Sequence, residues 1–246
     1  MGRVKIWCLH GAVGMTADWD EFAERMCAAG QEVCMVDLWG FVEEGACSFA
    51  DFAAELNARV RAEEEAPVLL GYSMGGRLAL HALLEDGVPW RAGVIVSAHP
   101  GIRDPEERVM RVAKDAEWAT GAFSGSWQKF LADWNSQGVL EGEMVGRLGD
   151  RNRLEPRRVA VARGFMEWSL GKQEDLGPRL GEIECPVLWL TGERDARFSA
   201  LAEEAIPLIS NGLHRVMSGA GHRVPWDAAE EFAQLVHEFV ANVKAP

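Results

Sequence analysis

Residues 68–81 constrain the fold of this chain more than any other segment. A short apolar run ends at Gly71 and is typical of a buried strand, and a helix-forming segment begins at Arg77. Ser73 lies between them, flanked by Gly71 and Gly75 in the pattern G-x-S-x-G. Strand, sharp turn and helix in this order hold a serine hydroxyl clear of a sheet, near the positive end of a helix. We therefore predict a reactive serine here, with an ordinary glycine-rich turn as the alternative.

The rest of the chain alternates between short apolar runs and segments of helical periodicity. The runs typical of buried strands are Val4–Leu9, Glu32–Val36, Val68–Gly71, Ala92–Ser97, Pro186–Gly192 and His214–Met217. The other predicted helices are Trp19–Ala29, with Asp18 as a possible N-cap, Phe49–Glu65, capped by Ser48, Ala200–Ile209 and Asp227–Val243. This alternation is the signature of a mostly parallel sheet with helices on both faces.

The alternation is interrupted from residue 100 to residue 181. This segment is strongly charged and has helical periodicity without a convincing strand, and it contains Trp118, Trp127, Trp134 and Trp168. We expect residues 1–99 and 182–246 to form an α/β core and residues 100–181 to be a helical lid inserted above the sheet. Most of these tryptophans are expected to pack lid helices together, because buried aromatic residues usually serve packing.

A serine becomes a strong nucleophile or base when a histidine takes its proton and a carboxylate fixes the histidine tautomer. In this architecture the order along the chain is serine, acid, histidine, each in a loop at the carboxyl end of a strand. Asp195 and His222 occupy such loops, so Ser73, Asp195 and His222 are predicted to be a catalytic triad. Backbone N–H groups of Ala12 and Met74 are predicted to form the oxyanion hole.

Composition limits the partners and the compartment. The chain has 38 acidic and 25 basic residues, and its formal net charge of -13 disfavours binding to nucleic acids or to anionic membranes. The five cysteines form no C-x-x-C pair, and four lie in apolar stretches, which indicates buried free thiols in a reducing compartment. We see no leader and no run of ~20 apolar residues, and therefore expect a soluble cytoplasmic protein. No His/Cys/Asp cluster has the spacing of metal ligands, so no metal is expected.

Four stretches carry a resemblance to a known family. They are residues 71–77, residues 99–101 followed by 106–108, residues 132–134 and residues 192–198. The chain resembles the α/β-hydrolase superfamily and, within it, the 2-succinyl-6-hydroxy-2,4-cyclohexadiene-1-carboxylate synthases of menaquinone biosynthesis. The resemblance implies a lyase that eliminates pyruvate from 2-succinyl-5-enolpyruvyl-6-hydroxy-3-cyclohexene-1-carboxylate without a cofactor. It also implies that the triad serine acts as a base on a carbon acid.

A substrate with several carboxylates needs guanidinium groups in an otherwise acidic protein. Arg77 lies four residues after Ser73, so both are expected to project from one helix face toward the pocket. Tyr72 flanks the serine and is a candidate donor to a carboxylate. Three further candidate binding residues follow from the resemblance: Arg111, Trp134 and Arg197. For all five, a surface ion pair or a packing role is the alternative.

Three segments depart from the family pattern. The His-Gly pair is followed by Ala12-Val13-Gly14 in place of a bulkier aromatic residue, which could alter the pocket shape. Residues 37–41 and 223–226 are also unusual. One rival function is a carboxylesterase or C–C-bond hydrolase that works through an acyl-serine intermediate, and a second is a non-catalytic ligand receptor. The oligomeric state is left open between a monomer and a small homo-oligomer.

Overall fold

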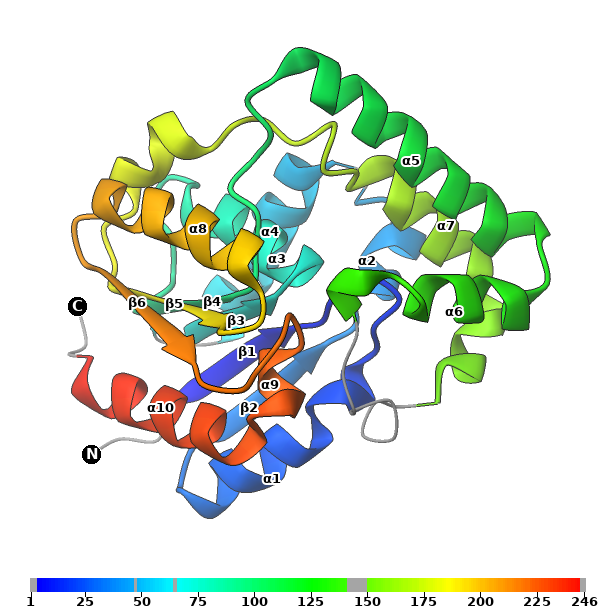
Figure 1. Cartoon of the computed structure of the whole chain (residues 1–246). Coiled ribbons are helices and arrows are strands. Elements are labelled where there is room, and N and C mark those ends of the chain that lie inside the picture. Colours follow the sequence, from blue (N-terminus) through cyan, green and yellow to red (C-terminus); the bar gives the residue numbers. More distant parts are fainter. Residues whose placement is uncertain (1–3, 47, 64–65, 141–149, 244–246) are drawn as a thin grey trace.

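The computed structural model describes residues 4–46, 48–63, 66–140 and 150–243. Six strands form one sheet in the order β2-β1-β3-β4-β5-β6, and every neighbouring pair is parallel (Figure 1). The strands are β1 (Lys5–Leu9), β2 (Glu32–Val36), β3 (Val68–Tyr72), β4 (Ala92–Val96), β5 (Val187–Gly192) and β6 (Gly212–Met217). All six overlap the predicted runs, so the predicted parallel sheet flanked by helices is confirmed.

The burial of the strands follows their position in the sheet. Every residue of β3, β4 and β5 is buried, as expected for parallel strands covered on both faces. The edge strands β2 and β6 are partly exposed. Because parallel strands run in one direction, the loops after β3, β5 and β6 meet at the same edge of the sheet, where Ser73, Asp195 and His222 are found.

Helices cover both faces of the sheet. On one face, α1 (Asp20–Ala28), α9 (Val224–Asp227) and α10 (Ala229–Asn242) enclose a core that includes Leu70 and Leu190. On the other face, α2 (Leu38–Glu44), α3 (Phe49–Glu63), α4 (Met74–Leu83) and α8 (Ala196–Ala205) pack over Leu69 and Trp189 (Figure 1). Alternate residues of β1, β3, β4 and β5 therefore enter two separate cores, which is the period-two pattern of a pleated strand.

The described residues between β4 and β5 contain helices and no strand, as the sequence predicts. They form α5 (Pro105–Ser124), α6 (Trp127–Asn135) and α7 (Arg158–Glu167), with short 3-10 helices at Gly138–Leu140, Arg151–Arg157 and Gly177–Glu182. Trp118 and Trp134 meet edge to face, with ring centroids 5.2 Å apart. Trp168 instead packs on Phe52 of α3, in the main core. Within the described residues, no helix has the length and apolarity needed to cross a membrane.

Two local predictions have different outcomes. Ser48 caps α3 as predicted, because its Oγ accepts from the Asp51 N–H at 3.0 Å. The prediction that Asp18 caps the next helix is wrong, because Asp18 lies inside a 3-10 helix, Thr16–Trp19. Its carboxylate accepts from the Met15 N–H at 3.0 Å and pairs with Arg151, which is 133 residues later in the chain. Asp18 therefore caps its own 3-10 helix and pairs with Arg151, and it does not cap the helix that follows.

The cysteines are less buried than predicted. The four that the structure describes are free thiols, but only Cys8 is buried. Cys34 and Cys185 are half-buried and Cys27 is exposed, so an apolar neighbourhood in sequence did not ensure burial. Cys47 lies outside the described residues, as do residues 64–65, at the end of the predicted helix Phe49–Glu65.

Candidate active site

The turn after β3 holds Ser73 in a conformation that non-glycine residues rarely adopt. Its φ is 52° and its ψ is -111°, and its N–H donates to the Val96 carbonyl at 2.8 Å. The glycines on either side are required by close backbone approach. A Cβ on Gly71 would lie 2.3 Å from the Gly75 carbonyl oxygen, and one on Gly75 would lie 2.4 Å from the carbonyl oxygen of Leu9.

Ser73, His222 and Asp195 form one hydrogen-bonded chain. His222 Nε2 lies 3.1 Å from Ser73 Oγ, and His222 Nδ1 lies 2.7 Å from Asp195 Oδ2. Both Asp195 and His222 are buried. When Nδ1–H donates to the carboxylate, Nε2 is left with a lone pair for the serine proton. The structure thus brings the three predicted residues together in an arrangement that can remove a proton from Ser73.

The loops that carry Asp195 and His222 pack closely against each other at a glycine. A Cβ on Gly192, at the end of β5, would lie 2.1 Å from the carbonyl oxygen of Gly221. The Arg194 N–H donates to the Ala220 carbonyl at 2.9 Å across the same contact. The separation of Asp195 and His222 is therefore set by backbone packing as well as by their own hydrogen bond.

The two predicted oxyanion donors lie beside the serine. Ala12 and Met74 both line the same cavity as Ser73. Met74 is the first residue of α4, so its N–H has no acceptor within the helix. The ring of Tyr72 packs against the loop after β1, where a Cβ on Gly11 would lie 2.7 Å from the tyrosine Cε1. This packing fixes the loop that carries Ala12 relative to the turn that carries Ser73.

A cavity of about 520 Å³ opens beside the hydrogen-bonded chain. Its walls come from the loops of the sheet and from α5 and α6, on the other side of the serine. All five predicted substrate-binding residues line it: Tyr72, Arg77, Arg111, Trp134 and Arg197.

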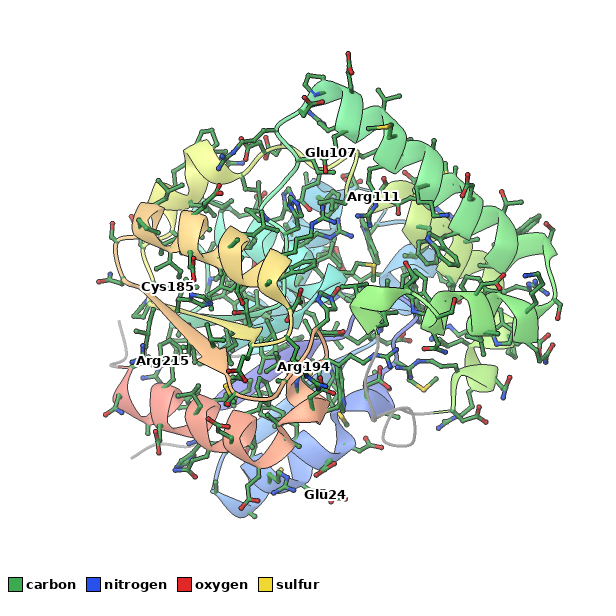
Figure 2. All side chains as sticks on the ribbon, viewed as in Figure 1. Glu24, Glu107, Arg111, Cys185, Arg194 and Arg215 are labelled. Atoms are coloured by element: carbon green, nitrogen blue, oxygen red, sulfur yellow. The ribbon has the colours of Figure 1, made fainter. Side chains whose placement is uncertain are left out.

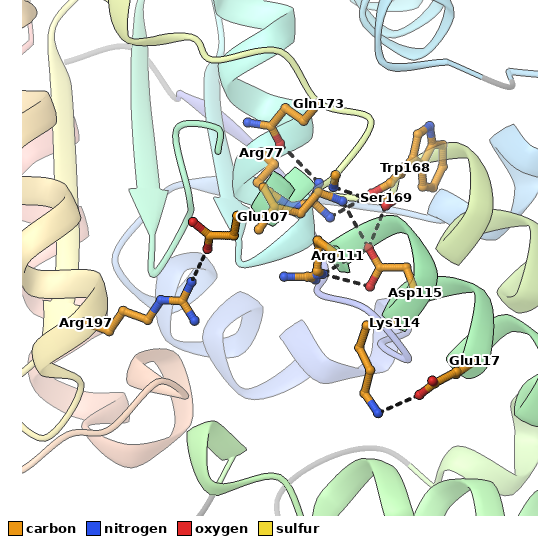
Figure 3. Close-up of polar contacts among 12 residues, drawn as sticks. Arg77, Glu107, Arg111, Lys114, Asp115, Glu117, Trp168, Ser169, Gln173 and Arg197 are labelled. Atoms are coloured by element: carbon orange, nitrogen blue, oxygen red, sulfur yellow. Dashed lines mark hydrogen bonds and ion pairs between the residues drawn. The ribbon is translucent and has the colours of Figure 1, made fainter. Parts of the chain in front are cut away.

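Arg77 is the predicted binding residue with the most unusual environment. Only 7% of its surface is exposed, and its guanidinium donates to the Trp168 carbonyl at 2.9 Å and to Gln173 Oε1 at 3.1 Å (Figure 3). Both acceptors are neutral, and among the described residues no carboxylate lies within ion-pair distance of Arg77. Burial lowers the pKa of Arg77 to about 9, and nearby Arg111 also lowers it while Asp115 opposes the shift. A buried cation held by neutral groups is a natural site for an anion.

Arg111 contributes a second guanidinium, which is fixed by a buried acid. Its Nε donates to both carboxylate oxygens of Asp115, at 2.9 and 3.0 Å (Figure 3). Asp115 also accepts from Ser169 Oγ at 2.7 Å and from the Leu170 N–H. The pair uses only Nε, so the terminal nitrogens of Arg111 keep their donors for a ligand. Sequence reasoning missed Asp115, although its i,i+4 spacing from Arg111 on a predicted helix was a usable signal.

The remaining predicted binding residues differ in exposure. Arg197 is at the rim, with 64% of its side chain exposed and an ion pair to Glu107 at 3.7 Å. Trp134 presents its ring to the cavity from α6, next to Trp118. Burial raises the pKa of Tyr72 well above the usual value, so its hydroxyl stays a neutral donor at ordinary pH.

Two polar residues of the site carried weak or no signal in the sequence. His99 lines the cavity, and its Nδ1 accepts from the Gly101 N–H at 3.0 Å. Burial, together with nearby Arg197 and Arg77, lowers the pKa of His99 to about 3, so it is neutral at physiological pH and offers no positive charge. Gln173, an acceptor for Arg77, had no sequence signal because it follows α7, 96 residues after the arginine. Across the described residues, no group of three or more His, Cys, Asp or Glu side chains is arranged to hold a metal ion.

His10 links the loop after β1 to α2 and should make stability depend on pH. Its Nδ1 lies 2.9 Å from the Gly11 carbonyl oxygen, and its Nε2 accepts from the Leu38 N–H at 3.4 Å. Burial lowers the pKa of His10 from 6.5 to about 4. Between these values the unfolded chain holds the proton and the folded chain does not, so stability falls as the pH drops.

We expect His10 to cost the folded state about 2 kcal/mol at pH 5 relative to pH 7. The measurement is urea unfolding of the wild type and of His10→Asn at both pH values. Between pH 7 and pH 5, the free energy of unfolding of the wild type should fall by about 2 kcal/mol more than that of the variant. Equal losses in the two proteins would show that His10 does not contribute.

Comparisons with known proteins show the family of the chain. A model described as the alpha/beta hydrolase family matches residues 8–235. The chain is 32% identical to the 2-succinyl-6-hydroxy-2,4-cyclohexadiene-1-carboxylate synthase of Pectobacterium atrosepticum, over 96% of this chain and 93% of that protein. It is 31% identical to the synthase of Serratia proteamaculans, over 96% of this chain and 92% of that one.

Solved structures share the fold at lower identity. A structure of MenH from S. aureus superposes with a TM-score of 0.86 at 23% identity, covering 98% of this chain and 95% of the other. A thermophilic esterase from Thermogutta terrifontis gives a TM-score of 0.76 at 21% identity, covering 99% and 92%. The chain therefore belongs to the alpha/beta hydrolase family and, within it, resembles the 2-succinyl-6-hydroxy-2,4-cyclohexadiene-1-carboxylate synthases.

Proposed function

We propose that this protein is a lyase that eliminates pyruvate from 2-succinyl-5-enolpyruvyl-6-hydroxy-3-cyclohexene-1-carboxylate in menaquinone biosynthesis, in the cytoplasm. The observation that carries the proposal is Arg77, a buried guanidinium with only neutral acceptors, in the cavity that also contains Ser73. An ester hydrolase for neutral substrates has no use for such a charge, whereas a substrate with several carboxylates does. The names of the relatives support the same reaction.

The reaction is a 1,4-elimination, as the names of substrate and product require. In our proposal His222, oriented by Asp195, takes the hydroxyl proton of Ser73, and the alkoxide removes the ring proton at C2, next to the succinyl carbonyl. The C2–H electrons form a C2–C3 double bond, the ring double bond moves to C4–C5, and the C5–O bond breaks. Enolpyruvate leaves and takes a proton to become pyruvate, so the serine hydroxyl and neutral histidine are regenerated.

The other residues of the cavity would bind the charges of the substrate. In this proposal the N–H groups of Ala12 and Met74 donate to the oxygen that gains negative charge when C2 loses its proton. Arg77 and Arg111 bind carboxylates, and Tyr72 donates to one of them. Arg197, exposed at the rim, attracts the anionic substrate to an acidic protein. Trp134 packs on the ring of the substrate, and residues 100–181 act as the lid.

The test is an ultraviolet assay of pyruvate elimination with enzymatically generated substrate. The wild type should turn over, and Arg77→Ala should reduce kcat/KM by about 100-fold or more, because a charge-assisted bidentate contact is lost from a desolvated site. Arg77→Lys should keep part of the activity, since it retains a charge without the planar fork. Arg215, exposed on β6 (Figure 2), supplies the control variant Arg215→Ala.

A carboxylesterase or C–C hydrolase is the second candidate, because the same Ser-His-Asp geometry serves acyl transfer. A thermophilic esterase also shares the fold. If the wild type releases no pyruvate but cleaves short aryl esters, and Arg77→Ala leaves that cleavage unchanged, the lyase proposal is wrong and the esterase is supported.

A further inference from the structure

Arg223 is a second buried arginine in the cavity, and the proposed reaction does not yet use it. It follows His222 directly and is 5% exposed, yet it lines the cavity. Its Nη2 donates to Asn135 Oδ1 at 2.9 Å. In the part of the chain that the structure describes, this is its one side-chain hydrogen bond, and no carboxylate lies within ion-pair distance. The guanidinium of Arg223, like that of Arg77, is therefore held by neutral groups.

The position of Arg223 is set by a neutral partner that is itself fixed. Asn135 is the last residue of α6, and its Nδ2 donates to the Leu131 carbonyl at 2.9 Å. That bond turns the amide so that its oxygen faces the guanidinium. A side chain from the loop after β6 is thus held by a helix on the other side of the cavity. An arginine fixed in this way, and deprived of solvent without a counter-charge, is unfavourable unless an anion completes the site.

Arg223 lies on a different wall from the other two arginines. Arg77 is bonded to the Trp168 carbonyl and Arg111 to Asp115, which contacts Ser169 and Leu170, so both belong to the wall formed by α5 and the segment after α7 (Figure 3). Arg223 is bonded to the end of α6 and influences Tyr72 by its charge. The cavity thus offers two separate points for negative charge, which are held by different partners.

We propose that Arg223, oriented by Asn135, binds a second carboxylate of the substrate, distinct from the one bound by Arg77. The inference deepens the proposed function and rests on it for the identity of the substrate. It specifies a ligand with at least two carboxylates, one for Arg77 and one for Arg223. It also gives Arg223 a role in specificity. Arg223 follows His222 in one of the segments that depart from the family pattern.

The test is calorimetric titration of stable probes, which does not require turnover. The diacid is 2-(3-carboxypropanoyl)benzoate, which has a ring carboxylate and a chain carboxylate. The matched monoacids are 2-butanoylbenzoate, without the chain carboxylate, and 4-oxo-4-phenylbutanoate, without the ring carboxylate. Each is titrated into the wild type, Arg223→Gln, Arg77→Gln and the surface control Arg215→Gln, after thermal unfolding has shown that every variant is folded.

We expect Arg223→Gln to weaken diacid binding by about tenfold or more, the range for a hydrogen bond to a charged group. Arg223→Gln should weaken the binding of one monoacid and leave the binding of the other unchanged. Arg77→Gln should affect the two monoacids in the opposite way. Arg223→Lys keeps the charge and should lose less affinity for the diacid. It serves as a second variant if Arg223→Gln does not fold. Arg215→Gln should bind all three probes as the wild type does.

Three results would overturn the inference. The first is that Arg223→Gln binds the diacid as tightly as the wild type does. The second is that Arg223→Gln loses affinity equally for both monoacids, and the third is that the wild type does not bind the diacid. The proposed function is judged separately by pyruvate release. If no pyruvate forms but the two arginines still select different carboxylates, the lyase assignment fails and the two-point anion site stands.

Discussion

Ser73→Ala is expected to lower kcat for pyruvate release by about 10³-fold or more while leaving KM within about threefold. In the proposed reaction this hydroxyl is the group that His222 deprotonates, and alanine would remove the base that takes the substrate proton. Binding should survive, because in the proposed reaction Arg77 and the other arginines hold the substrate. The measurement is steady-state kinetics of the wild type and the variant in the ultraviolet assay.

The control for this substitution is Ser218→Ala, which removes an exposed hydroxyl that donates to Glu193 Oε2 at 3.3 Å. It should retain wild-type rates. A residual rate in Ser73→Ala within tenfold of the wild type would show that another group is the base. Intact-protein mass spectrometry during turnover distinguishes the base from a nucleophile, because a substrate adduct on the wild type that is absent from Ser73→Ala would indicate covalent catalysis.

Gly75→Ala is expected to destabilise the folded protein by at least about 3 kcal/mol or to prevent folding. The added Cβ would lie 2.4 Å from the Leu9 carbonyl oxygen and 2.5 Å from that of His10. Both are backbone atoms of the end of β1 and the loop after it, so neither can rotate away as a flexible side chain would. The measurement is the free energy of unfolding from urea denaturation.

The matched control is Gly138→Ala, where an added Cβ meets no atom of the described residues within 4 Å and the glycine is exposed. It should change stability by less than about 0.5 kcal/mol. If both variants unfold at the same urea concentration as the wild type, helix α4 can move away from β1, and the close approach at Gly75 does not support the position of Ser73.

The fold and the hydrogen-bonded chain of Ser73, His222 and Asp195 could be predicted because both have local signals in the sequence. Each parallel strand is a continuous apolar run, so all six were visible without knowledge of their neighbours. The elbow around Ser73 needs glycines at fixed offsets, and this requirement appears directly in the sequence. Asp195 and His222 were found by their order and by their places after strands, since the parallel sheet then brings their loops to one edge.

The environment of the charges could not be predicted, because it depends on pairs far apart in the chain. Asp18 looked like a helix cap, but its partner Arg151 is 133 residues away and changes its role. Nothing local indicates that Arg77 has neutral acceptors 91 and 96 residues later. Arg223 was noticed only as part of an unusual segment, because its bond to Asn135 spans 88 residues.

The two acceptors of Arg77 have a consequence for protein engineering. The arginine belongs to the sheet-covering helix α4, but its acceptors, the Trp168 carbonyl and Gln173, lie in the segment between α7 and β5. A chimera that receives residues 100–181 from an esterase would keep Arg77 and remove both groups that aim it. Substrate preference should therefore not be exchangeable by transplanting the helices alone, and a successful hybrid would need the arginine and its two acceptors moved as one unit.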